Sequence, residues 1–97
     1  MIKVAIIDDE KHCILTLQHH LNMIQDVEIV AITQNSNEAK TLIDQRKPDL
    51  VFLDIDMPQL TGFQVMEQFE NPSFQVVFVT AYDQYAIKAI KLNALDY

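Results

Sequence analysis

The sequence predicts an α/β domain with a parallel sheet, and two regularities carry that prediction. Four short apolar runs begin at residues 2, 27, 50 and 76, so each run is followed by room for one helix. Between the runs, apolar residues recur at the spacing that gives a helix one apolar face. Strands that alternate with helices in this way are typical of repeated βα units, whose strands lie parallel in one sheet.

Each element is expected from its own residues. The runs at 2–7, 27–32, 50–53 and 76–79 are short and apolar, as buried strands are. Helical spacing predicts amphipathic helices around residues 14–24, 39–43, 63–69 and 86–90. Ser36 and Asp83 stand where N-caps are wanted, because a side-chain oxygen there accepts a free backbone N–H of the first helical turn.

Composition and charge exclude several classes of protein. A chain of 97 residues that is 49% hydrophobic and 22% charged, with one glycine, is a single globular domain rather than a disordered or collagen-like chain. Its net charge of -7 argues against direct binding to nucleic acid or anionic lipid and favours a cationic small ligand. Cys13 has no disulfide partner, and the apolar start is too short for a signal peptide or membrane span, so we expect a cytoplasmic domain.

Polar side chains follow three of the predicted strands. Asp8 and Asp9 come after the first strand, Asp54 and then Asp56 after the third, and Thr80 after the fourth. In open α/β folds ligands bind outside the carboxyl ends of the strands, so these side chains are expected at one edge. Carboxylates about 5 Å apart repel by roughly 3 kcal/mol at an effective dielectric constant near 20, which calls for a cation. A ligand set made of oxygen atoms alone favours Mg²⁺ or Mn²⁺ over Zn²⁺.

Simpler structural roles compete with this interpretation. An aspartate after a strand often only caps the following helix, and Glu10 is expected to stabilise a first helical turn through the helix dipole. Cys13 is expected to be a small buried side chain of the first helix. The histidines are expected on an exposed helix face: His12, His19 and His20. The methionines are expected to be packing residues: Met23, Met57 and Met66.

Taken together, the order and spacing of these residues resemble those of the receiver domain of a two-component response regulator. The resemblance covers essentially the whole chain, residues 1–97. Its motifs are the pair Asp8 and Asp9, Asp54 in VFLDIDMPQLTG with Pro58 and Gly62, and Thr80 and Ala81 in FVTA. It implies a flavodoxin-like (CheY-like) doubly wound sheet with strand order 2-1-3-4 and a fifth strand only begun. The stretch TAYDQYAIKAIKLNALDY further resembles receivers of the LytR/AlgR type, which usually carry a LytTR DNA-binding output domain.

The resemblance also implies a chemistry. Asp54 would be the phosphoacceptor that takes a phosphoryl group from a phosphohistidine of a sensor histidine kinase or from a small phosphodonor. Mg²⁺ (or Mn²⁺) would be held by Asp8, Asp9, Asp54 and the backbone carbonyl of Asp56, and would neutralise the phosphoryl oxygens. The product would be a conformational state that regulates transcription through the output domain, so the domain would not be an enzyme.

A conformational switch is implied at the end of the chain. Thr80 would turn its hydroxyl toward the phosphoryl group, with the amide of Ala81 nearby, and Tyr97 would move inward into the vacated space. The catalytic lysine of the family would fall beyond Tyr97, as would most of the fifth strand and all of the fifth helix. We therefore expect weakened phosphotransfer. We also expect an uncovered apolar face that favours a homodimer or a domain-swapped dimer.

Two other functions remain open from the sequence. VFLDIDMP superficially resembles the DxD motif of haloacid-dehalogenase-like phosphohydrolases, with Asp54 as nucleophile and Asp56 as acid and base. That motif usually follows a first strand, whereas here it follows the third. A protein-binding module that is not phosphorylated is the second alternative. Nucleotide binding is less credible than either, because the single Gly62 supplies neither a GxGxxG turn nor a P-loop. DNA would be bound only through an output domain.

Overall fold

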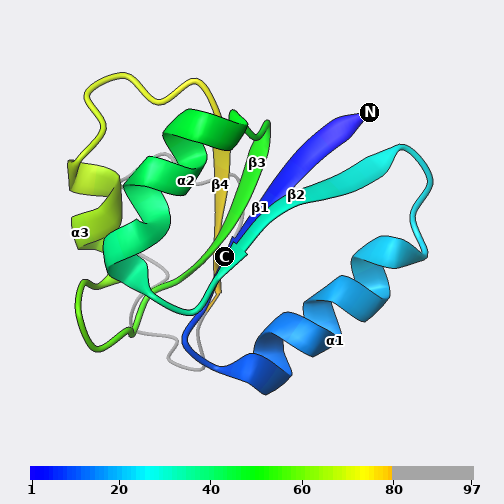
Figure 1. Cartoon of the computed structure of the whole chain (residues 1–97), viewed down its shortest axis with the longest axis horizontal. Coiled ribbons are helices and arrows are strands. Elements are labelled where there is room, and N and C mark those ends of the chain that lie inside the picture. Colours follow the sequence, from blue (N-terminus) through cyan, green and yellow to red (C-terminus); the bar gives the residue numbers. More distant parts are fainter. Residues whose placement is uncertain (80–97) are drawn as a thin grey trace.

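The structure, a computed structural model, describes residues 1–79 of the chain. Strands alternate with helices throughout this part (Figure 1). The elements in chain order are β1 (Ile2–Ile7), α1 (Lys11–Asn22), β2 (Val27–Thr33), the 3₁₀ helix η1 (Ser36–Glu38), α2 (Ala39–Arg46), β3 (Leu50–Asp54), α3 (Gly62–Glu67) and β4 (Gln75–Val79). None of these helices is long and apolar enough to cross a membrane.

The sheet has the order β2-β1-β3-β4, and every pair of neighbouring strands is parallel. This confirms the predicted strand order for the four strands that the structure describes. β1 and β3 lie side by side in the centre of the sheet. β2 is added on one side of β1, and β3 and β4 are added on the other side, so the strand order reverses between β1 and β3. Ile7 pairs with Leu53 at their carboxyl ends, so the residues that follow these two strands emerge next to each other. A parallel doubly wound sheet presents its ligand site at this kind of strand order reversal.

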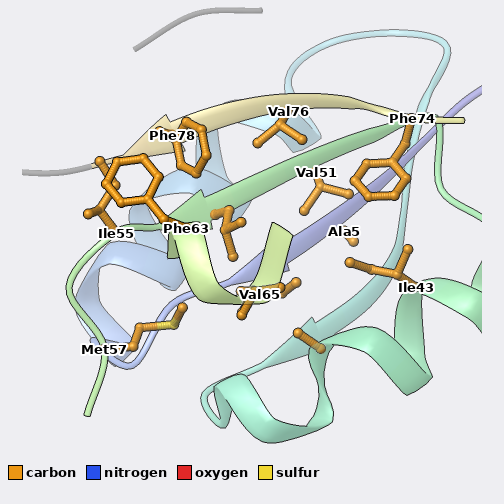
Figure 2. Packing of buried hydrophobic residues seen from close by; sticks show 13 residues of the cluster. Ala5, Ile43, Val51, Ile55, Met57, Phe63, Val65, Phe74, Val76 and Phe78 are labelled. Atoms are coloured by element: carbon orange, nitrogen blue, oxygen red, sulfur yellow. The ribbon is translucent and has the colours of Figure 1, made fainter. Parts of the chain in front are cut away.

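Helices cover both faces of the sheet, with α2 and α3 on one face and α1 on the other (Figure 1). Successive strand residues point to opposite faces, so β1, β2 and β3 each contribute to two apolar clusters. The larger cluster packs under α2 and α3, where Phe63 and Phe78 have ring centroids 5.0 Å apart (Figure 2). The smaller cluster packs under α1 and contains Val4, Ile6, Ile14 and Leu21.

Helix α1 is shorter than its apolar pattern predicts. It ends at Asn22, and Asp26 adopts a left-handed φ of 67° in the turn that leads to β2. Ile24 therefore falls outside the helix and is 53% exposed, and Met23 at the C-cap is 65% exposed. The prediction that Met23 is a packing residue is wrong for this reason. Met57 is buried and Met66 packs against the larger cluster, as predicted.

Two further expectations about local structure are corrected. Cys13 is exposed rather than buried, because it lines an open cavity between α1 and the strands β3 and β4, whereas Ile14 and Leu21 pack in the smaller cluster. Ser36 is not an N-cap: Asn35 caps η1 by accepting the N–H of Asn37, and Ser36 lies within that helix. The three histidines of α1 are exposed, as predicted. Asp83 and the helix predicted around residues 86–90 lie outside the described residues.

Candidate functional site

Three aspartates meet at the carboxyl edge of the sheet. Asp8 follows β1 directly, Asp9 comes next, and Asp54 is the last residue of β3, the neighbouring strand. Each offers a carboxylate oxygen, and these three oxygens lie within 4.8 Å of one another. The sequence prediction that the first and third strands bring these side chains together is confirmed by this geometry. The pairing of residues 4–7 of β1 with residues 50–53 of β3 places the carboxyl ends of the two strands side by side, where these aspartates follow.

Backbone N–H groups orient two of the carboxylates. Oδ1 of Asp8 accepts a hydrogen bond of 2.9 Å from the backbone N–H of Glu10. Oδ1 of Asp54 accepts one of 3.2 Å from the backbone N–H of Asp56. Each aspartate therefore closes a short turn on its own loop, but neither caps the following helix, because the N-cap of α1 is Glu10 and that of α3 is Thr61. A carboxylate has two oxygens, so this use leaves Oδ2 of each side chain available to a further partner.

Burial makes the negative charge of the cluster costly. Asp8 is 6% exposed and Asp54 is 8% exposed. Burial, the hydrogen bond to the Asp9 side chain and the charge of Asp8 raise the pKa of Asp54 to about 8. Burial also raises the pKa of Asp8, while its hydrogen bond from Glu10 acts in the opposite direction. Carboxyl groups so arranged hold either shared protons or a cation at neutral pH.

The donor set fits a hard divalent cation. All three groups of the cluster are carboxylates, and no cysteine or histidine belongs to it within residues 1–79. Mg²⁺ and Mn²⁺ prefer such oxygen ligands, and the positive charge would offset the repulsion that raises the pKa of Asp54. The side chain of Asp56 is exposed and is not a member of the cluster.

The loop between β3 and α3 needs glycine at position 62. A Cβ atom on Gly62 would lie 2.5 Å from the carbonyl oxygen of Asp54, which is closer than real Cβ contacts come. The backbone N–H of Gly62 donates to the carbonyl of Ile55 over 2.8 Å and holds the loop against the end of β3. α3 then begins with a capping box between Thr61 and Gln64. Glycine at position 62 thus allows the backbone at the start of α3 to lie close to the backbone of Asp54.

Polar residues at the end of β2 and directly after it contribute to the same edge, and sequence reasoning missed these contacts. The carbonyl of Thr33 accepts the backbone N–H of Asp8 over 3.2 Å. The side chain of Gln34 donates to the carbonyl of Asp9 over 3.2 Å. The hydroxyl of Ser36 accepts the backbone N–H of Leu60 over 2.8 Å. The run of polar residues after an apolar strand is the only signal of these contacts in the sequence, and it is equally typical of an ordinary turn.

A cavity of about 480 Å³ opens between α1 and the β3 and β4 strands. Leu17, Phe52 and Val77 contribute apolar surface to it, and Asp8 and His12 contribute polar groups. The expected switch residues Thr80, Ala81 and Tyr97 lie outside the described residues. Val79, which precedes Thr80, pairs with Asp54 at the end of β4.

Comparison with known proteins identifies relatives of the chain. Residues 4–97 match the model of the response regulator receiver domain. The chain is 43% identical over 98 residues to an uncharacterised response regulatory protein of Yersinia pestis. It is 38% identical over 100 residues to the sensory transduction protein LytT of Bacillus cereus. Both matches span the whole chain but only 41% and 40% of those proteins, so the chain covers about two fifths of the length of these relatives.

A solved structure agrees with these matches. The response regulatory domain of the protein mrkE from Klebsiella pneumoniae is similar with a TM-score of 0.87 and 31% sequence identity. That similarity covers 99% of this chain and 80% of the solved one. The parallel sheet of order β2-β1-β3-β4 is thus the CheY-like receiver fold predicted from the sequence. The family match over residues 4–97 and the aspartate cluster at the sheet edge lead to one conclusion: the chain belongs to the response regulator receiver domain family.

Proposed function

We propose that Asp54 is the phosphoacceptor of this receiver domain and that residues 1–97 act as one phosphorylation-controlled unit. The carrying observation is the cluster of Asp8, Asp9 and Asp54, whose carboxylate oxygens lie within 4.8 Å at the carboxyl edge of the sheet. Asp54 comes from the central strand β3 and is backed by Gly62, so its carboxylate projects from a well-supported backbone. Receiver domains are signalling modules rather than dedicated enzymes, and we assign this chain the same role.

The proposed reaction transfers a phosphoryl group to the Asp54 carboxylate. A carboxylate oxygen attacks phosphorus, an O–P bond forms, and the P–N bond of the donor phosphohistidine breaks with its electron pair returning to the imidazole. The hydrogen bond from the N–H of Asp56 keeps Oδ1 oriented, which leaves Oδ2 as the attacking atom. The raised pKa of Asp54 means that the carboxylate must lose its proton before it attacks.

The same residues would hold Mg²⁺ (or Mn²⁺) next to the nucleophile. Asp8, Asp9 and Asp54 supply carboxylate oxygens, and we assign a further oxygen to the backbone carbonyl of Asp56. Bound Mg²⁺ would supply positive charge that stabilises the phosphoryl oxygens during transfer. Its charge would also favour the ionised, attacking form of the Asp54 carboxylate.

The response to phosphorylation is assigned to the residues that follow β4. We propose that the hydroxyl of Thr80 and the amide of Ala81 contact the phosphoryl group, and that Tyr97 changes position in consequence. The pairing of Val79 with Asp54 supports this assignment, because Thr80 follows Val79 directly in the chain. We further propose a sensor histidine kinase as the phosphoryl donor and a LytTR DNA-binding output domain in the complete regulator. The similarity to LytT supports the output domain.

Intact-mass spectrometry tests the phosphoacceptor assignment. The chain is incubated with acetyl phosphate and Mg²⁺, and the matched variants are Asp54→Ala and Asp56→Ala. We expect one phosphoryl increment on the parent chain and on Asp56→Ala, because Asp56 would contribute only its backbone carbonyl. We expect none on Asp54→Ala. An increment that survives in Asp54→Ala, or its absence from the parent chain, would contradict the proposal.

Self-association is the remaining proposal about partners. The apolar residues that line the cavity beside α1, among them Phe52 and Val77, support a homodimer or an exchange of elements between two copies. Size-exclusion chromatography with light scattering measures it. We expect the mass of a dimer at micromolar concentration, and a monomer at all concentrations would contradict this proposal.

A further inference from the structure

Ser36 joins two loops that are far apart in the sequence. Its side chain is fully buried, with 0% exposure, and its hydroxyl oxygen accepts the backbone N–H of Leu60 over 2.8 Å. Ser36 belongs to η1, which follows β2, whereas Leu60 belongs to the loop between β3 and α3. The loop that contains Leu60 begins right after Asp54 and includes Asp56. A buried hydroxyl therefore holds the loop that directly follows Asp54 and carries the backbone carbonyl of Asp56, one of the proposed metal ligands.

The other side of η1 is connected to the Asp8 end of the site. The backbone N–H of Asn35 donates to the hydroxyl of Thr33 over 3.0 Å, and that hydroxyl donates to the Glu38 carboxylate over 3.0 Å. The carbonyl of Thr33 in turn accepts the N–H of Asp8 over 3.2 Å. Residues 33–38 are thus hydrogen-bonded to the loop after β1 through Thr33 and to the loop after β3 through Ser36, and their own backbone connects the two contacts.

This path matters because the sheet alone does not fix both loops. The pairing of β1 with β3 ends at Ile7 and Leu53, before the carboxylates begin. Beyond that point the spacing of Asp8 and Asp9 relative to Asp56 depends on loop contacts. Two backbone hydrogen bonds hold the start of the loop between β3 and α3. The N–H of Ile55 donates to the carbonyl of Val79, and the N–H of Gly62 donates to the carbonyl of Ile55. Leu60 packs at the margin of the larger apolar cluster and is held from the side by Ser36.

We propose that Ser36 is a positioning residue that sets the Mg²⁺ affinity of the Asp8, Asp9 and Asp54 cluster by holding the β3 to α3 loop. The inference rests on the proposed function, because it takes Mg²⁺ as the ligand of that cluster. A partner that orients a ligand-bearing segment typically changes metal affinity by tenfold or more when it is lost. Ser36 acts through Leu60 and the loop, so loss of its hydroxyl is expected to weaken Mg²⁺ binding by about tenfold.

The test compares two variants that each remove one hydroxyl near this loop. Ser36→Ala removes the acceptor of the Leu60 N–H with almost no change of volume. Thr61→Ala removes the acceptor of the Gln64 N–H at the start of α3, 3.1 Å away, and leaves the Ser36 contact in place. Mg²⁺ dissociation constants are measured by isothermal titration calorimetry. Urea unfolding serves as the control that both variants fold, and it compares the stability that each one loses. Asp54→Asn identifies the heat that belongs to the cluster.

The outcomes separate the inference from the proposed function. We expect Ser36→Ala to weaken Mg²⁺ binding by about tenfold and Thr61→Ala by less than about twofold. Equal affinity in Ser36→Ala and the parent chain, or an equal loss in both variants, would overturn the positioning role while the Mg²⁺ site stands. Heat of binding that persists unchanged in Asp54→Asn, or no binding by the parent chain, would overturn the metal site and the inference together.

A second measurement needs no variant. If the Ser36 contact favours Mg²⁺ binding, then bound Mg²⁺ must favour the contact by the same factor. Hydrogen exchange of the Leu60 amide is therefore expected to slow by about tenfold in saturating Mg²⁺, and that of the Gln64 amide by much less. Equal protection of both amides would contradict the positioning role even if Ser36→Ala fails to fold.

Discussion

Replacing Asp54 by asparagine should stabilise the metal-free protein, although it removes the proposed phosphoacceptor. The buried carboxyl group of Asp54 lies beside those of Asp8 and Asp9, with one oxygen of each group within 4.8 Å of the other two. Asparagine has nearly the same shape, and its Oδ1 can still accept the N–H of Asp56. Its amide group can also donate to a neighbouring carboxylate. The substitution therefore removes one charge and keeps the local hydrogen bonding.

The size of the gain follows from two quantities. At a separation of 4.8 Å and an effective dielectric constant near 20, two carboxylates repel by about 3 kcal/mol. The rise in the pKa of Asp54 from 3.8 to about 8 corresponds to about 6 kcal/mol, which also contains the cost of burying the charge. The asparagine amide loses hydration on burial as well. We therefore expect a gain near the smaller figure, about 3 kcal/mol at pH 9.

The sign of the pH dependence follows from the same shift. The pKa of Asp54 is higher in the folded chain than in the unfolded chain, so the folded state binds more protons between the two values. This contribution to stability is complete below about pH 4 and is lost as the pH rises to about 8. Asp54→Asn lacks that loss, so its stability relative to the parent chain should rise steadily above pH 4 and reach an advantage of about 3 kcal/mol at pH 9.

Urea unfolding followed by far-UV circular dichroism measures the difference. The matched control is Asp56→Asn, which changes an exposed carboxylate outside the cluster and should alter stability by less than about 0.5 kcal/mol. Saturating Mg²⁺ should reduce the advantage of Asp54→Asn, because the cation offsets the repulsion in the parent chain. An advantage that is absent at pH 9, or equal at both pH values, would refute the electrostatic reasoning.

Three other substitutions test the packing and backbone around the site, each by urea unfolding. Gly62→Ala should destabilise the fold by about 3 kcal/mol, because its Cβ would lie 2.5 Å from the carbonyl oxygen of Asp54; an unchanged midpoint would show that the loop gives way freely. Lys47→Gly should stabilise by about 0.5 kcal/mol, because the C-cap of α2 has a left-handed φ of 49°; a loss of stability would contradict this explanation. Ile43→Val should destabilise by about 1 kcal/mol, since Ile43 is 3% exposed in the larger cluster, and a change below about 0.3 kcal/mol would contradict tight packing there.

The sheet was accessible to sequence reasoning because each strand is a short apolar run between amphipathic segments. β1 has the predicted bounds, and β3 differs only by including Asp54. The helix ends were less accessible. α1 ends before Ile24 because a left-handed turn at Asp26 redirects the chain, and no apolar pattern reports the φ of a single residue. Helical spacing also did not show that Cys13 is exposed, because that depends on how α1 packs beside the sheet.

The candidate site was partly accessible from the sequence. Parallel strands place their carboxyl ends at one edge, so the meeting of Asp8 and Asp54 follows from the strand order. The role of Ser36 did not follow, because its partner Leu60 is 24 positions away in a loop of irregular conformation. A serine before a predicted helix is more simply an N-cap, and only the packed structure shows that Asn35 has that role. The contacts between loops are determined by tertiary packing, which has no local sequence signal.

The central claim is that the phosphoryl group is carried by Asp54 rather than by another carboxylate of the cluster. An acyl phosphate on aspartate is reduced by borohydride to homoserine, which marks the modified position. The chain is phosphorylated with acetyl phosphate and Mg²⁺, reduced, digested and sequenced by tandem mass spectrometry. The account predicts homoserine at position 54 alone. Homoserine at position 8, 9 or 56, or a phosphorylated chain that yields no homoserine, would contradict it.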